Sequence, residues 1–575
     1  MPLFFAASLG SEDGQKRAGS AVLDALTVDG RRTLQTYQTD KVILALDGDP
    51  NHDASCLAKS PNGNVIAFAG YAYNLAEAGL EQGTPDQTAR ILLAAFEQKG
   101  VAAFKGLNGY FAAAIWEAET RKLHVLRDAM GLHPAFVLGR RGATLACSEY
   151  QPLMRFFEEE NALCPDAVLE YLLAGTVLGG KTFVSDIKML DAGAALSVQN
   201  GRVATQVYDR FGLDEPVVDA SLDEHAEAVN EAFVSGMKRR LAHFGPSAGP
   251  INLTGGLDTR LILSSIPSDV RADLTWVTSR NPHLAEAEDT EVIYAKLVAA
   301  RFGVKHIIRA PNPDLSVNDF SDTTFEATRR LPSAAVRNIH GVYGTELLGG
   351  CFRAGFEGVF AVTGSVEETV ENLFTPEFVA KLGSLDDLKA FISRSRDLGM
   401  PDMLRPLLGG FLTTLYGGML GGWAAPWEKF LLSEHYPFLD REVVNALLRV
   451  PPRHLENYAL YARLFLNHHR VAAELPFHSG ACRHPDLMIV MPGHADPDAR
   501  ARRYGVFADQ LRQTILAGQR PHLGSILANW PDAEFLRTDR AQPLTKAQVH
   551  LLELEAWLGR YLGFDAAATR PPARG

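Results

Sequence analysis

The first 210 residues alternate short apolar runs with polar turns. The runs include residues 41–48 (KVILALDG), 64–73 (NVIAFAGYAY) and 110–118 (YFAAAIWEA), and Gly, Asn and Pro residues separate them. Apolar runs of this length between turn residues are typical of β-strands. The pattern predicts a domain of the α+β class over residues 1–210, in which stacked sheets dominate.

Two segments of this half have helical spacing instead. Residues 86–100 (DQTARILLAAFEQKG) place apolar side chains at helical intervals and end on Gly100, and residues 166–175 (DAVLEYLLAG) run from Asp166 to Gly175. Glycine often follows the last residue of a helix, and Asp is a favourable N-cap. We therefore expect two helices here, the second capped by Asp166.

The pattern changes after Leu213. An acidic stretch at 214–227 precedes an apolar strand at 251–253, and strands then alternate with helices to about residue 310. This order predicts an α/β domain with a doubly wound parallel sheet. We place the boundary near residues 210–222 and the second domain at 222–575, mainly helical from about residue 372 and closed by an amphipathic helix at 547–563.

Composition excludes some partners. The formal net charge of the 575 residues, 56 − 68 = −12, disfavours nucleic acid and anionic membranes. No run approaches the 18 or so apolar residues of a membrane span, so we expect a cytoplasmic protein. The cysteines are five in number and show no CxxC spacing, which argues against a disulfide framework or a zinc site. We expect each to be reduced and buried: Cys56, Cys147, Cys164, Cys351 and Cys482.

Residues 251–260 (INLTGGLDTR) carry the strongest chemical signal. An apolar strand runs into two glycines and then into a helix, and Thr254 and Thr259 flank the turn. Glycines expose backbone N–H groups, a helix N-terminus favours anions, and hydroxyls donate to phosphate oxygens. A phosphate would repel Asp258 unless a cation lay between them, so the segment predicts a phosphate site with Mg²⁺.

The segment LTGGLDTR resembles the SGGxDS pyrophosphate loop of the asparagine synthetase family, with Thr in place of each Ser. The resemblance implies an enzyme that splits ATP between the α- and β-phosphates, forms an acyl-adenylate and uses ATP and Mg²⁺. It also implies that backbone atoms at the end of strand 274–279 contact adenine. The residues that it assigns to nucleotide binding are Leu253, Thr254, Gly255, Gly256, Asp258, Thr259, Val277, Thr278 and Gly344.

Two further segments fit the same family. Glu291 begins a predicted helix with small residues at positions 295 and 299 and Gly303 at its end, which is the family's spacing. Residues 340–346 (HGVYGTE) resemble its second loop, so Glu346 would join Asp258 as a magnesium ligand. Residues 358–368 (GVFAVTGSVEE) are the alternative second loop, with Glu367 and Glu368 as the acids.

Residues 435–452 (HYPFLDREVVNALLRVPP) and 474–477 (ELPF) resemble later family segments. The family usually carries a lysine shortly after this Leu-Pro, where it stabilises negative charge during adenylation or assists amide formation. His484 stands there, next to Arg483, and we assign both as candidate catalytic cations. The alternative is a basic pair on the surface, in which case the chain would be a non-catalytic scaffold subunit.

The first domain resembles the family's N-terminal-nucleophile glutamine amidotransferase domain, through residues 68–74 (FAGYAYN) and 126–134 (LRDAMGLHP). That domain uses a Cys immediately after the initiator Met, whose thiolate attacks glutamine. This sequence has Pro2 there, so we expect no glutamine hydrolysis and a structural role for Asn74.

The resulting fold prediction is an N-terminal-nucleophile (class II glutamine amidotransferase-like) sandwich followed by a doubly wound ATP-pyrophosphatase domain. The predicted function is adenylation of a carboxylate, in a small molecule or a peptide, and its transfer to ammonia or an amine. Among related enzymes, β-lactam synthetases and lasso-peptide cyclases also lack the Cys, so a lactam or macrolactam cyclase acting on a precursor peptide is included. Glutamine-hydrolysing asparagine synthetase is a further alternative, and the sequence leaves the substrates and the oligomeric state open.

Overall fold

The structure is a computed structural model that describes a large part of the chain. The described residues are 3–9, 33–48, 56–81, 83–148, 150–156, 161–175, 177–210, 216–244, 251–280, 285–309, 337–339, 341, 344–348, 360–397, 433–477, 522–528, 551, 554–555 and 558.

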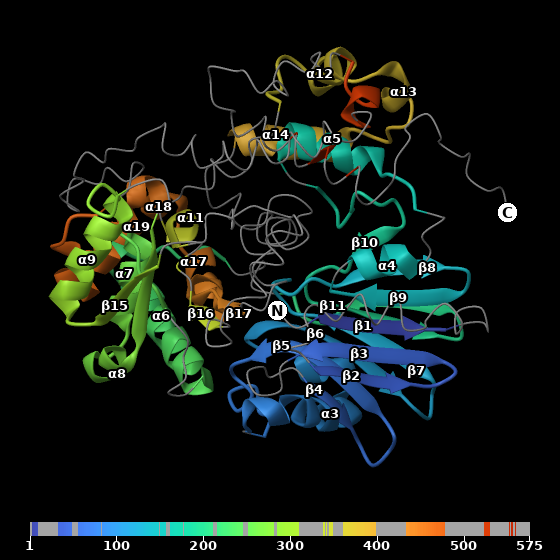
Figure 1. Cartoon of the computed structure of the whole chain (residues 1–575), viewed down its shortest axis with the longest axis horizontal. Coiled ribbons are helices and arrows are strands. Elements are labelled where there is room, and N and C mark those ends of the chain that lie inside the picture. The colour runs from blue at the N-terminus through green and yellow to red at the C-terminus, as the bar shows by residue number, and fades with distance from the viewer. Residues whose placement is uncertain are drawn as a thin grey trace.

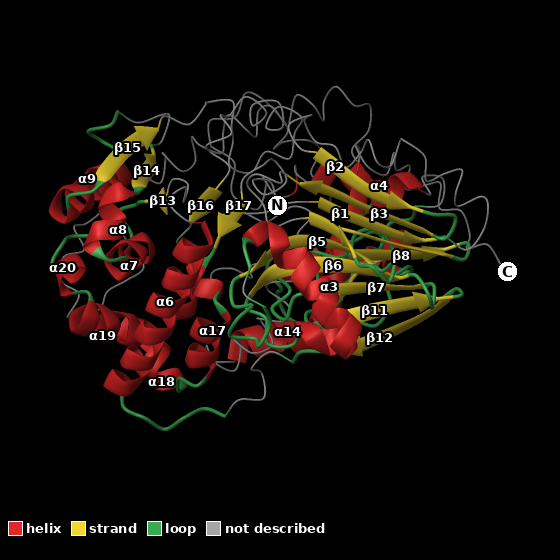
Figure 2. Cartoon of the chain, turned by 90° about the horizontal axis from the view of Figure 1, so that it is seen from below, coloured by secondary structure: helices red, strands yellow, loops and turns green. Residues whose placement is uncertain are grey.

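The N-terminal half contains two six-stranded antiparallel sheets that stack face to face (Figures 1 and 2). The first has the order β10-β8-β9-β1-β3-β2 and consists of β1 (Leu3–Ser8), β2 (Thr33–Gln38), β3 (Val42–Gly48), β8 (Phe136–Arg140), β9 (Ala143–Cys147) and β10 (Ile187–Met189). The second has the order β12-β11-β7-β6-β5-β4 and consists of β4 (Cys56–Lys59), β5 (Val65–Ala72), β6 (Gly109–Glu117), β7 (Lys122–Arg127), β11 (Ala194–Gln199) and β12 (Arg202–Val207).

Alternating side chains of both sheets form the core between them. Phe4 and Leu44 of the first sheet pack in one buried cluster with Val65, Ala114 and Trp116 of the second. This is the arrangement expected when period-2 apolar positions of two sheets face each other. The predicted stacked sheets are therefore confirmed.

Both helices predicted in this half are present, as α3 (Thr88–Lys99) and α5 (Pro165–Ala174). The predicted Asp166 cap of α5 is wrong. Cys164 occupies the N-cap position and Pro165 the first helical turn, where its fixed φ suits a helix start. Asp166 instead accepts a hydrogen bond from the Gly383 backbone N–H at 2.8 Å.

The second half contains a five-stranded parallel sheet of order β15-β14-β13-β16-β17. Its strands are β13 (Ile251–Asn252), β14 (Thr275–Ser279), β15 (Lys305–Arg309), β16 (Arg337–Ile339) and β17 (Ser433–His435). The helices α7 (Leu257–Ser265), α8 (Ser268–Asp273) and α9 (Thr290–Phe302) lie between the first three strands along the chain. From β13 the chain builds outward to β15 and then continues on the other side with β16. Ligands of doubly wound sheets bind at the carboxyl ends of the strands flanking such a reversal.

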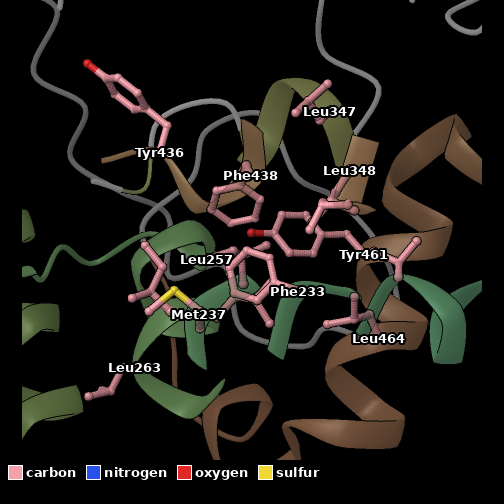
Figure 3. Close-up of a cluster of buried hydrophobic side chains, with 14 of the residues drawn as sticks. Phe233, Met237, Leu257, Leu263, Leu347, Leu348, Tyr436, Phe438, Tyr461 and Leu464 are labelled. Carbon is pink, nitrogen blue, oxygen red and sulfur yellow. The ribbon is translucent and has the colours of Figure 1, made fainter. Parts of the chain in front are cut away.

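A second group of helices covers this sheet. It comprises α6 (Leu222–Phe244), α17 (Arg441–Leu448), α18 (Pro452–Leu455), α19 (Ala459–His468) and α20 (Arg470–Ala473). Figure 3 shows their common core, in which Phe233 and Met237 of α6 meet Tyr461 of α19, Leu257 of α7 and Phe438. The segment that follows β17 therefore belongs to the parallel-sheet core.

The remaining described C-terminal segments pack elsewhere. The helices α12 (Val366–Leu373), α13 (Pro376–Val379) and α14 (Asp386–Asp397) lie beside α5 (Figure 1). Leu551, Leu554 and Leu558, from the predicted amphipathic helix, are buried in the same cluster. The antiparallel strands end at Val207 and the parallel strands begin at Ile251, and these later segments pack in one cluster with residues of the first sheet. The boundary near residues 210–222 stays a prediction.

No described helix is long and apolar enough to cross a membrane. Among the cysteines within the described ranges, Cys147 is buried, as expected, whereas Cys56 and Cys164 are only half-buried. Burial raises the pKa of both half-buried thiols. Cys351 and Cys482 lie outside the described residues.

Candidate functional site

The loop predicted to bind phosphate connects β13 to α7, at the carboxyl end of the central strand. The Leu253 N–H continues the sheet ladder by donating to Val277 O at 2.9 Å. Gly256 is the N-cap of α7 and has no side chain that could accept a hydrogen bond from the first helical N–H groups. The first N–H groups of a helix have no partner within it, so the start of α7 is suited to an acceptor from outside.

The two threonines of this loop are hydrogen-bonded to each other. Their Oγ1 atoms lie 3.0 Å apart, the Thr254 N–H donates to Thr259 Oγ1 at 2.9 Å, and the Gly256 N–H donates to Thr254 Oγ1 at 3.1 Å. The Gly255 N–H donates to Glu291 Oε2 at 2.9 Å. The hydroxyls of the loop and the Glu291 carboxylate therefore hold its backbone in place, and a phosphate would have to replace some of these hydrogen bonds.

Glycines of the predicted second loop lie directly against Asp258. A β-carbon on Gly344 would lie 2.6 Å from Asp258 Oδ1, and one on Gly341 would lie 3.0 Å from Asp258 Cβ. Only glycine allows so close an approach without movement. The structure thus brings the loops after β13 and β16 together, as the resemblance implied.

Glu346 lies in α11 (Gly344–Leu348), which begins at this contact. Its side chain is outside the described part of the chain, as is all of His340. The position of its helix places the Glu346 backbone two residues beyond the glycine that contacts Asp258. Its role as a metal ligand stays a prediction.

The acids of the alternative second loop have other partners. Ser365 and Glu368 form a capping box at the start of α12, and Glu367 Oε1 accepts a hydrogen bond from Lys389 Nζ at 2.8 Å. The hydrogen bond with Lys389 lowers the pKa of Glu367. Because α12 packs in the cluster around α5 and α7 packs in the parallel-sheet core, the structure does not bring these acids to Asp258.

The residues predicted near adenine are at the end of β14. Thr278 Oγ1 donates to Leu253 O at 2.5 Å and lies 2.7 Å from His306 Nε2. A hydroxyl has one proton, so Thr278 accepts from His306, which must carry its proton on Nε2. Burial lowers the pKa of His306, which favours the neutral ring. Val277 and Thr278 are therefore fixed next to Leu253 by the sheet and by this hydroxyl.

Arg260 was not recognised from the sequence, yet it anchors the loop. Its guanidinium is fully buried and donates to Gly255 O at 2.9 Å, to Leu475 O at 2.8 Å and to Pro476 O. Burial lowers the pKa of Arg260 to about 10, so it stays charged near neutral pH. It joins the glycine loop to the Leu-Pro segment. Arg483 and His484, predicted a few residues later, lie outside the described residues.

Tyr461 is the second residue that the sequence did not reveal. Its hydroxyl donates to Asp258 Oδ1 at 2.7 Å, and its side chain is fully buried. The two residues are 203 positions apart, so no local pattern connects them.

The two halves of the chain meet at a buried acid, Asp440. Asn108, the residue just before β6, donates from Nδ2 to Asp440 Oδ1 at 2.9 Å. Arg240 Nη1 of α6 lies 2.5 Å from Asp440 Oδ2. Burial by itself would raise the pKa of Asp440, but Arg240 and Arg239 together hold it below its ordinary value. The charge is thus stabilised where the domains join.

Further side chains tie the N-terminal domain to the second. Arg441 forms a two-pronged ion pair with Asp209, at 2.7 and 3.0 Å, and Tyr73 Oη lies 2.6 Å from His435 Nδ1. Asn74 Oδ1 accepts from the Asn108 N–H at 2.7 Å, and its Nδ2 donates to Gly106 O at 3.0 Å. These two bonds to backbone are those of a structural asparagine.

Comparison with known proteins identifies the first domain. The family model described as a glutamine amidotransferase domain matches residues 38–209. A protein of Mycobacterium bovis named "Putative asparagine synthetase (glutamine-hydrolyzing)" is 24% identical over 278 residues, and proteins of the same name from two strains of Mycobacterium tuberculosis match equally. The aligned part is 44% of this chain and 40% of those relatives, so the match spans two fifths of their length.

Two solved structures of lower similarity also match part of the chain. Glutamine phosphoribosylpyrophosphate amidotransferase from B. subtilis, complexed with ADP and GMP, is 11% identical, covers 60% of this chain and 77% of its own, and has a TM-score of 0.25. The structure entitled "allosteric regulatory enzyme of purine biosynthesis" is 11% identical, covers 54% and 65%, and has a TM-score of 0.24.

Proposed function

Because the chain is related to the asparagine synthetases, we propose that it is an ATP-dependent carbon–nitrogen ligase that adenylates a carboxylate and transfers the acyl group to ammonia or an amine. One observation carries the proposal: Asp258, at the start of α7, lies against Gly344 of the next loop. A carboxylate between two glycine-containing loops, at the reversal point of a parallel sheet, suits the binding of a metal–nucleotide complex.

The residues present fit a magnesium ion. Asp258 would supply a hard oxygen ligand, and the lack of a side chain at Gly344 lets the second loop approach its carboxylate. In the proposal Asp258 and Glu346 hold the ion, which supplies positive charge to the phosphate oxygens.

The chain's own groups would then act on ATP. The N–H groups of residues 254–256 and the hydroxyls of Thr254 and Thr259 exchange their present bonds for oxygens of the leaving pyrophosphate. Substrate carboxylate attacks the α-phosphorus, and the bond to the bridging oxygen of pyrophosphate breaks. The amine then attacks the acyl carbon, AMP leaves, and the amine nitrogen loses a proton. Positioning and charge stabilisation account for the catalysis, with Arg483 and His484 as the proposed cations.

Ring closure is the intramolecular form of the same reaction. When one substrate carries both the carboxylate and the amine, the product is a lactam or macrolactam, as proposed for a precursor peptide. The N-terminal domain would then serve as a scaffold, and its contacts to Asp440 and Arg441 support that role. An assay with ammonia, free amines or glutamine as the nitrogen source separates these forms from a glutamine-hydrolysing synthetase.

A non-catalytic scaffold is the second candidate. It is favoured by the hydrogen bonds that already engage the loop between β13 and α7. Glu291 already occupies the Gly255 N–H, and the two threonines bond to each other. In a scaffold these bonds would persist in the presence of ATP.

Pyrophosphate release distinguishes the two candidates. The full chain is incubated with ATP, Mg²⁺ and a panel of amino-acid and peptide carboxylates, and AMP and ADP are quantified. We expect AMP and pyrophosphate with at least one carboxylate. In Asp258→Asn we expect the rate of AMP formation to fall about 100-fold. Asp269→Asn, an exposed acid in the first turn of α8, is the matched control and should be silent. ADP as the product, or no turnover together with no ATP binding, would refute the ligase.

A further inference from the structure

We propose that Tyr461 is a positioning residue for the metal–nucleotide site, holding the Asp258 carboxylate in its ligating orientation. The inference rests on the proposed function and goes beyond it, because it assigns part of the site to α19, a helix 203 residues further along the chain. The phenol donates to Asp258 Oδ1 at 2.7 Å.

The Tyr461 ring is held on several sides. It stacks nearly parallel to Tyr458, at an interplanar angle of 4°, and contacts Phe465 with ring centroids 5.4 Å apart. Figure 3 shows the ring between Phe438 and Leu464, with its hydroxyl pointing toward Leu257 at the start of α7. A buried ring packed in this way cannot turn its hydroxyl elsewhere without displacing the core.

Tyr458, the residue just before α19, carries strain. Tyr458 has φ = 62° in the left-handed region, and its side chain is buried. Left-handed backbone at a bulky residue costs about 1 kcal/mol or more, and it persists only where the surroundings enforce it. The left-handed conformation of Tyr458 turns the chain from the 3-10 turn at Glu456–Tyr458 into α19, the helix that carries Tyr461.

The hydrogen bond restricts one oxygen of the carboxylate. With Oδ1 fixed by Tyr461 and packed against Gly344, rotation of the Asp258 carboxyl group is limited. Partners that orient a metal ligand in this way typically change metal affinity 10- to 100-fold when they are removed. Tyr461 would therefore act on magnesium binding through Asp258, without touching the nucleotide.

Metal-dependent nucleotide binding tests the role. Binding of α,β-methylene-ATP, which cannot be split at the reacting bond, is measured by calorimetry on the full chain across a magnesium titration and again in EDTA. In Tyr461→Phe we expect the half-saturating magnesium concentration to rise about tenfold, with binding in EDTA unchanged. In an Asp258→Asn background, Tyr461→Phe should add no further change, because both substitutions act on the same ligand.

Tyr208→Phe is the matched control. Tyr208 Oη also donates a 2.7 Å hydrogen bond, to Arg127 O in the N-terminal domain, so the same substitution removes an equivalent bond far from the site. It should lower thermal stability as much as Tyr461→Phe does and leave the magnesium dependence as in the wild type. If Tyr461→Phe changes binding equally with magnesium and in EDTA, or not at all, the positioning role is overturned while the ligase stands. A wild-type chain that binds no nucleotide overturns both.

Discussion

Thr254 and Thr259 close the loop after β13 on itself, with their Oγ1 atoms 3.0 Å apart and the Thr254 N–H donating to Thr259 Oγ1 at 2.9 Å. Thr259 is almost fully buried, whereas Thr254 is partly exposed. The inner hydroxyl therefore orients the outer one and the backbone between them. This relationship explains how threonine can stand where the resembling family has serine, because the bonds need only the hydroxyl.

Removal of the inner hydroxyl should impair nucleotide binding. Thr259→Val keeps the shape of the side chain but leaves the Thr254 N–H without its acceptor. We expect the affinity for Mg²⁺·ATP, measured by calorimetry, to fall roughly 10- to 100-fold, the range for a hydrogen bond that serves a charged group. Thr259→Ser retains the hydroxyl and should stay within about threefold of the wild type. Equal affinities for the Val and Ser variants would contradict this role.

The sequence predicted those parts of the fold that local pattern determines. The expected helix from Glu291 to Gly303 is α9, and Gly303 ends it with φ = 64°, as a helix C-cap glycine should. The Asp166 cap failed because Pro165, one residue earlier, already starts the helix. Both outcomes depend on neighbours in sequence, where propensity rules are informative.

Long-range contacts could not be predicted in this way. Arg260 bonds to Leu475 O, 215 residues away, and Tyr461 bonds to Asp258 across 203 residues. Each residue occupies a helical position that packing alone would explain, so the sequence gives no sign of its polar partner. The contact of Asp258 with Gly344 was anticipated only through resemblance to a family, because the separation of two residues in sequence does not determine their distance in the fold.

Glu291 should oppose nucleotide binding through its charge. Its carboxylate accepts from the Gly255 N–H at 2.9 Å, a donor that the proposed pyrophosphate site needs. Glu291→Gln keeps an oxygen acceptor of the same length but removes the repulsion of phosphate. We expect ATP to bind several-fold more tightly, most clearly at low magnesium concentration where phosphate charge is least neutralised. Glu288→Gln, an exposed neighbour, is the control, and weaker binding in Glu291→Gln would show that the carboxylate serves the nucleotide.

The acid between the domains should be essential for stability. Asp440→Asn leaves Arg240 buried beside a neutral amide, and breaking a buried ion pair from one side costs about 3–5 kcal/mol of unfolding free energy. Asp219→Asn is the matched control, because its pair with Arg453 has a similar length of 2.6 Å but both side chains are largely exposed. Urea unfolding should show a large loss for Asp440→Asn and none for Asp219→Asn. Similar losses would mean that burial does not decide the strength of these pairs.

His469 should make the fold sensitive to mild acid. Burial, with a contribution from the neighbouring His468, lowers the pKa of His469 from 6.5 to about 4, and its Nε2 lies 2.8 Å from Asn230 Oδ1. In the folded chain the ring is therefore neutral down to about pH 4, while in the unfolded chain it binds a proton below about pH 6.5. The unfolded state gains protons first, so this stabilising contribution is fully present above pH 6.5 and is lost as the pH falls toward 4.

The size of this effect follows from the two pKa values. At pH 5 the pH lies about 1.5 units below the pKa of the unfolded state. Proton binding to the unfolded chain therefore lowers the unfolding free energy by about 2 kcal/mol relative to pH 8. The comparison is with His469→Gln, whose amide can still donate to Asn230 but does not titrate. Between pH 8 and pH 5 the unfolding free energy of the wild type should fall by about 2 kcal/mol more than that of the variant. Parallel curves for the two proteins would show that His469 is already protonated in the fold, and hence that Asn230 and its surroundings stabilise the charged ring.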